Sequence, residues 1–143
     1  MLDWSPLHPI RTRFLKGYAL MPDLDEIHAK VIPHSDQRYD TTGDYFTKDG
    51  IEEFRISRLS DERHEHLILV HELIERILCH HRGISNEAID RFDFDYVKSG
   101  KLGEPGDDPQ APYHAEHRFA TKIEKLLAQE LEVEWNRYLD DEP

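Results

Sequence analysis

Three residues near the middle of the chain, His71, Glu72 and Glu75, have the types and the spacing that metal chemistry requires. If this stretch is a helix, His71 and Glu75 lie one turn apart on the same face, whereas Glu72 lies one step around the helix. An imidazole and a carboxylate that converge on one point can bind a divalent metal ion. Glu72 could then accept a proton from water bound to that metal.

An open metal site needs at least a third protein ligand. The strongest candidates are His114 and His117, three residues apart at the predicted start of the last helix. The chain has ten histidines among 143 residues, and histidine is the commonest metal ligand, which strengthens this expectation. Such a ligand set suits zinc, with iron, manganese and nickel as alternatives. Further candidate ligands are Asp90, Glu116 and Glu124.

The segment around His71 predicts one long helix over residues 60–83. Ser60 or Asp61 can cap its first turn, and Gly83 can end it. Apolar residues recur at three- and four-residue spacing, which is typical of a helix with one buried face. These residues are Leu67, Val70, Ile74, Ile77 and Leu78.

A β-hairpin is predicted directly before this helix. Residues 42–47 and 51–58 favour strands, and Asp49-Gly50 between them is typical of a two-residue hairpin turn. A hairpin of this size is marginal alone, so it must pack on something, and the adjacent helix is the obvious partner. Residues 28–33 are a candidate third strand.

Two more helices are predicted after residue 83. Ser85 is a suitable N-cap for a helix over residues 86–97. Residues 98–112 contain three glycines and three prolines and predict an irregular loop. The last helix is predicted from residue 112 or 113 to about residue 138. Its expected buried stripe consists of Phe119, Ile123, Leu126, Leu127, Leu131 and Trp135.

Together these elements predict an α+β fold in which a small antiparallel hairpin, with the candidate third strand, packs on three helices. Residues 21–143 would form a single domain, because a chain of this length can bury one core. Residues 1–20 are predicted to be a loose N-terminal arm.

The composition excludes several classes of partner. A net charge of −12 argues against nucleic acid or an anionic membrane as the main partner, since both attract basic surfaces. No run of eighteen apolar residues is present, so no segment is expected to span a membrane. The single cysteine, Cys79, excludes an internal disulfide and fits a reducing, cytoplasmic location. The sequence does not define an oligomeric state.

The stretch VHELIERIL, in a helix that follows a β-strand, resembles the active-site helix of the zincin-like metallohydrolases, whose motif is His-Glu-x-x-His. The resemblance covers about residues 42–82. It implies that His71 is the first metal ligand and Glu72 the general base of a peptidase-like or amidase-like hydrolase. Glu75 stands where that family has its second histidine, which changes the charge of the site. An extended peptide could bind as an added strand at the hairpin edge.

Outside that segment, the chain resembles small uncharacterised bacterial and phage proteins, for which no chemistry is implied. The likeness lies in Gly43-Asp44-Tyr45, Gly83-Ile84-Ser85 and Pro112-Tyr113-His114, together with the motif helix.

Other functions fit the same residues. His71 and Glu75 could form a structural ion pair one turn apart. The protein could be non-enzymatic, with a structural metal or with an acidic surface for a basic partner. Alternatively, the spacing Glu72-x-x-Glu75 followed by Glu87-x-x-Asp90 resembles the magnesium-binding carboxylates of all-α nucleoside-triphosphate pyrophosphohydrolases.

Overall fold

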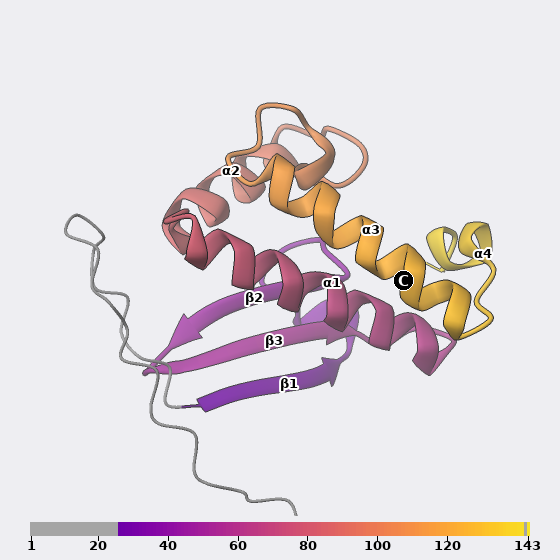
Figure 1. The fold of residues 1–143 in the computed structure, drawn as a ribbon. Coiled ribbons are helices and arrows are strands. Elements are labelled where there is room, and N and C mark those ends of the chain that lie inside the picture. Colours follow the sequence, from indigo (N-terminus) through magenta and orange to yellow (C-terminus); the bar gives the residue numbers. More distant parts are fainter. Residues whose placement is uncertain (1–25, 142) are drawn as a thin grey trace, which may run out of the picture.

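The fold is taken from a computed structural model that describes residues 26–141 and 143. The predicted arm at residues 1–20 lies outside these residues. The fold is α+β, as the sequence predicts, with a three-stranded sheet and four helices (Figure 1). The elements are β1 (Glu26–Ile32), β2 (Gly43–Lys48), β3 (Ile51–Ser57), α1 (Glu62–His81), α2 (Asn86–Lys98), α3 (His114–Glu130) and α4 (Trp135–Leu139). Two short 3-10 turns, η1 (His34–Asp36) and η2 (Pro105–Asp107), lie in the connections.

The sheet has the strand order β1-β3-β2. The predicted hairpin is β2 and β3, which pair antiparallel, and both turn residues, Asp49 and Gly50, have the positive φ angles of a mirror-image turn. The candidate third strand is β1, which pairs parallel with β3 from Glu26 to Ile32. This order leaves β2 at one edge of the sheet.

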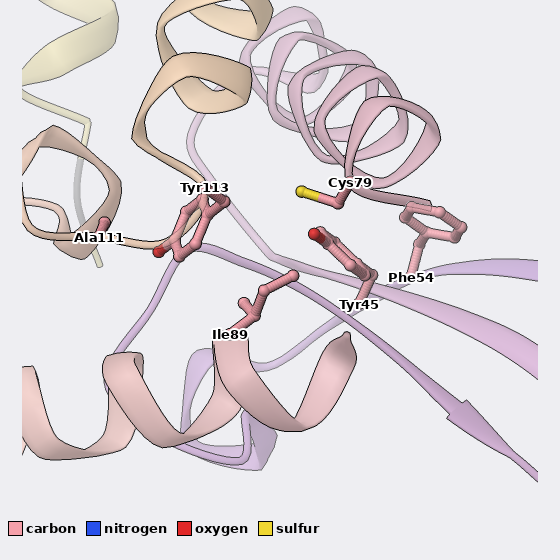
Figure 2. Packing of buried hydrophobic residues seen from close by; sticks show 6 residues of the cluster. All are labelled: Tyr45, Phe54, Cys79, Ile89, Ala111 and Tyr113. Atoms are coloured by element: carbon pink, nitrogen blue, oxygen red, sulfur yellow. The ribbon is translucent and has the colours of Figure 1, made fainter. Parts of the chain in front are cut away.

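Helix α1 lies across the sheet and contacts β2, β3 and, on its other side, α3 (Figure 1). Asp61 and Ser85 cap α1 and α2, as their sequences predict. The apolar core is divided into two clusters. One holds Tyr45, Phe54, Cys79, Ile89, Ala111 and Tyr113, contributed by both hairpin strands, two helices and the loop before α3 (Figure 2). The other holds Ile56, Leu67, Ile68, Ala128 and Tyr138.

The buried face of α1 differs from the predicted apolar stripe. Ile77 is 47% exposed, and Val70 and Ile74 are only partly buried. The side chains that face inward at four- and three-residue spacing are His64, Ile68, His71, Glu75 and Cys79. His71 and Glu75 therefore lie in the middle of the buried face of α1.

The predicted last helix is divided into two. Helix α3 ends at Glu130, and Glu132 adopts a left-handed φ of 55°. The N–H of Val133 donates to the carbonyl of Ala128, and the N–H of Glu132 donates to the carbonyl of Gln129. These are the two hydrogen bonds of a Schellman motif at a helix C-terminus. The sequence prediction missed this break because no glycine or proline marks it.

After the break, α4 packs back against the other helices. Tyr138 of α4 is buried, and Asp141 lies 2.5 Å from Nδ1 of His64 at the start of α1. The sequence does not predict this contact, because His64 and Asp141 are far apart in the chain. The C-terminal segment is therefore anchored to α1.

The predicted stripe of α3 is also rotated. Phe119 and Leu126 are exposed, whereas the buried positions are Glu116, His117, Ala120, Glu124 and Ala128. Polar side chains thus occupy the centre of the α1–α3 interface. The predicted irregular loop, residues 98–112, contains the short turn η2.

Two leucines test this rotation. Leu67 is fully buried and Leu126 is 59% exposed, although the sequence places both in a helical apolar stripe. We expect Leu67→Ala to lower the free energy of unfolding by about 2–5 kcal/mol because it leaves a cavity. Leu126→Ala should change it by less than about 0.5 kcal/mol. Urea unfolding of both variants measures this, and equal losses would contradict the observed orientation of α3.

Candidate metal centre

Three side chains from two helices converge at the α1–α3 interface. Nε2 of His71 lies 3.0 Å from Nδ1 of His117, and Oε2 of Glu75 lies 3.0 Å from the same Nδ1. Oε2 of Glu75 and Nε2 of His71 are 3.3 Å apart. All three residues are buried. The structure thus brings together His71, Glu75 and one of the two histidines that the sequence offered as a third ligand.

The spacing of these three atoms fits a tetrahedral metal ion. Bonds of about 2.0–2.2 Å in tetrahedral geometry separate neighbouring ligand atoms by about 3.3 Å. Two histidines and one glutamate are also the ligand set of several catalytic zinc sites, in which the fourth position is left for water or substrate. The residues present therefore fit a zinc ion or a similar divalent metal.

Two of these three side chains, His71 and Glu75, also form a hydrogen bond with a residue outside the cluster. Nδ1 of His71 donates to Oε2 of Glu124 at 2.8 Å, and the hydroxyl of Tyr138 donates to the other oxygen of that carboxylate. The hydroxyl of Tyr45 donates to Oε1 of Glu75 at 3.3 Å. Such partners fix the tautomer and the orientation of a metal-binding histidine. Glu124, a further candidate ligand in the sequence, supports His71 in this way.

Hydrogen bonds in this cluster favour the charged forms of its members. Burial alone would lower the pKa of His71, but its bonds to Glu124 and Glu75 outweigh burial and raise the pKa well above the ordinary value. Burial would raise the pKa of Glu75, but bonds with His117 and His71 lower it. In the absence of a metal ion, the buried carboxylates therefore favour protonation of the imidazoles beside them.

Glu72 lies beside the cluster and lines the same cavity. Its carboxylate rests on β2 at Gly43, where an added Cβ would lie 2.5 Å from Oε1 of Glu72 and 2.6 Å from Cγ2 of Ile68. Residue 43 must therefore be glycine for Glu72 to keep this position. Burial and the neighbouring charge of Glu75 raise the pKa of Glu72 well above its ordinary value.

The cavity has a volume of about 490 Å³ and is bounded by β2, α1, α2, the loop around residue 104 and α3. On its α2 side, Asp93 accepts hydrogen bonds from Tyr113 at 2.5 Å and Tyr39 at 3.1 Å. Tyr113 is buried and its hydroxyl is engaged by this bond. The hydroxyl of Tyr113 is therefore not free to stabilise an oxyanion.

The remaining candidate ligands point elsewhere. Nδ1 of His114 lies 2.9 Å from the carbonyl oxygen of Gly106, outside the group of converging ligand atoms. Glu116 pairs with Arg82, and Asp90 pairs with Arg38. His114, Glu116 and Asp90 therefore do not join the converging ligand atoms, because the rotation of α3 and the arginine partners could not be read from spacing.

Sequence reasoning missed the contributions of Tyr138, Asp93, Glu104 and Asp107. The two acidic residues of the loop lie beside Nε2 of His117, at 3.3 Å for Glu104 and 3.2 Å for Asp107. The sequence contains one signal that could have identified Glu124 as the hydrogen-bond partner of His71. Glu124 follows His117 by seven residues, so both lie on one face of any helix that holds them.

Comparison of the chain with known protein families, with curated proteins and with solved structures gives no match. In residues 26–141 and 143, no helix is long and apolar enough to span a membrane. The geometry of the site is therefore the basis for the functional argument.

The carboxyl group of Asp93 should titrate near neutral pH. Burial raises its pKa to about 7, although the hydrogen bonds from Tyr113 and Tyr39 favour the ionised form. We expect the 13C NMR shift of this carboxyl, in chelator-treated protein, to titrate with a midpoint near pH 7. Tyr113→Phe should raise the midpoint, because it removes a hydrogen bond to the carboxylate.

Tyr96→Phe is the matched control for this titration, since the Tyr96 hydroxyl donates to the carbonyl of Leu102 instead. A midpoint below pH 5 in the unsubstituted protein would contradict the dominance of burial over the two tyrosine hydrogen bonds.

Proposed function

We propose that the protein is a metal-dependent hydrolase whose metal is bound by His71, Glu75 and His117. The observation that carries this proposal is the convergence of the three ligand atoms within 3.0–3.3 Å, beside a fourth residue, the acidic Glu72, in the same cavity. Zinc is the expected ion, because two imidazoles and one carboxylate suit it.

A zinc ion at this position would polarise a substrate carbonyl and acidify a bound water. His71 would hold the ion as a neutral imidazole whose proton Glu124 keeps on Nδ1, and Nδ1 of His117 would be the second nitrogen ligand. Glu72 accepts a proton from the attacking water and returns it to the leaving group. The positive charge of the ion would lower the raised pKa of Glu72, so that it is ionised and can act as a base.

An extended peptide is the substrate that suits the shape of the site. Strand β2 is an edge strand, and Gly43, Asp44 and Tyr45 line the cavity. A peptide could therefore add to β2, an edge strand of the described sheet, and pass beside the metal ligands. The cavity is also lined by Asp40 and Glu104, whose negative charge would repel nucleoside triphosphates.

The pyrophosphohydrolase alternative has less support from the geometry. Asp90 is bonded to Arg38 by both carboxylate oxygens, and Glu87 is exposed. Among residues 26–141, these two do not join Glu72 and Glu75 in a group that could hold a metal ion.

Two histidines of α3 give a matched test of metal binding. We expect purified, untagged protein to retain about one equivalent of zinc per chain in the buried centre. His117→Ala and His71→Ala should lose it, since each removes a ligand. His114→Ala should retain it, because this side chain bonds to Gly106. Elemental analysis of the four proteins after gel filtration measures the metal content.

Loss of zinc from His114→Ala but not from His117→Ala would contradict the assigned ligand set. An unsubstituted protein that holds no zinc, and whose melting temperature zinc does not raise, would overturn the hydrolase proposal. Stabilisation by magnesium together with a nucleotide would instead support the pyrophosphohydrolase.

Glu72 can be tested separately from metal binding. We expect Glu72→Gln to retain the metal and to lower kcat for peptide hydrolysis by about 10²–10⁴-fold, because the amide cannot accept the proton. Internally quenched peptides provide the assay. Glu62→Gln, at an exposed position in the first turn of the same helix, should retain full activity.

A protein that binds zinc tightly but hydrolyses none of the peptides, with or without Glu72, would indicate a structural metal. The non-enzymatic alternative would then replace the hydrolase.

A further inference from the structure

His117 has a second acidic group on the opposite side of its ring. While Nδ1 faces His71 and Glu75, Nε2 lies 3.3 Å from Oε2 of Glu104 and 3.2 Å from Oδ1 of Asp107. These three residues also have the spacing of a group that could hold a metal ion. The His117 side chain is nearly fully buried, whereas Glu104 is 58% exposed and Asp107 is 71% exposed.

The backbone of η2 holds these two carboxylates in place. Gly106 packs flat on the His117 ring, where an added Cβ would lie 2.4 Å from Cγ and Nδ1. Nδ1 of His114 lies at hydrogen-bond distance from the Gly106 carbonyl, and Pro105 fixes the backbone at the start of the turn. The backbone of this loop therefore holds Glu104 and Asp107 beside Nε2 of His117.

The charges around Nε2 are unbalanced. One ring nitrogen can donate only one proton, yet two carboxylates lie within 3.3 Å of it. Within residues 26–141, no lysine or arginine forms an ion pair with either carboxylate, although Lys101 of the same loop pairs with Asp108. Two carboxylates that share a site without a cation repel each other.

We propose that Glu104, Asp107 and Nε2 of His117 bind a second divalent cation. This inference rests on the proposed function, because His117 would then link the two metal sites through its two nitrogens, as an imidazolate that has released its ring proton to solvent. Metal–nitrogen bonds of about 2.0 Å on opposite sides of one ring place the ions about 6 Å apart. Two carboxylates and one imidazole suit manganese or zinc. The exposed carboxylates leave coordination positions open, so this ion exchanges faster than the buried one.

The stoichiometry of metal binding tests the proposal. The full chain is stripped with a chelator and dialysed to equilibrium against zinc or, separately, manganese, and bound metal is measured by elemental analysis. We expect two equivalents of zinc in the unsubstituted protein and one in the double variant Glu104→Gln/Asp107→Asn. His71→Ala should lose the buried equivalent and keep the other. Asp108→Asn, an isosteric change in the same loop, should still bind two.

Each other pattern has a distinct meaning. One equivalent in both the unsubstituted protein and the double variant would overturn the second site but not the hydrolase, and would show that the loop carboxylates only accept a hydrogen bond from His117. One equivalent that survives His71→Ala but not the double variant would support the loop site and overturn the buried centre. No bound metal in any protein would overturn both. Thermal melts show whether each variant is folded.

Discussion

The burial of carboxylates beside two imidazoles is the constraint on which the rest of this structure depends. Glu75 and Glu124 are buried around His71 and His117 at the α1–α3 interface. An unpaired buried charge costs several kcal/mol, so these side chains must meet with good geometry or the interface fails. Their mutual contacts therefore fix the rotation of both helices, and other segments adapt to it.

Apolar packing is arranged around this polar centre. The two apolar clusters lie toward opposite ends of α1, one with Cys79 and one with Leu67, and the His–Glu network lies between them. Because polar residues hold the middle of the interface, Ile77, Phe119 and Leu126 are left on the outside. A fully satisfied polar network specifies one packing arrangement, whereas an apolar interface would tolerate several.

The centre is completed by segments distant in sequence. Strand β2 contributes the glycine that admits Glu72, η2 contributes the glycine that covers the His117 ring, and α4 contributes the tyrosine that bonds to Glu124. His117 is the side chain common to the buried cluster and the exposed loop. A change in the position of η2 or α4 is therefore expected to change the His–Glu cluster, although neither segment supplies one of its three converging side chains.

The sequence by itself determined the local features. Helix α1, the Asp49-Gly50 turn and the Ser85 cap follow from short-range chemistry, and the convergence of His71 with Glu75 follows from the pitch of a helix. Only the tertiary structure decided that His117 and not His114 joins them, that Glu124 is an outer partner, and that α3 breaks before α4. Apolar spacing locates a helix in the sequence but does not set the rotation of that helix about its axis. The rotation of α1 and α3 depends on contacts that involve Gly106, Glu124 and Tyr138, which come from segments far apart in the chain.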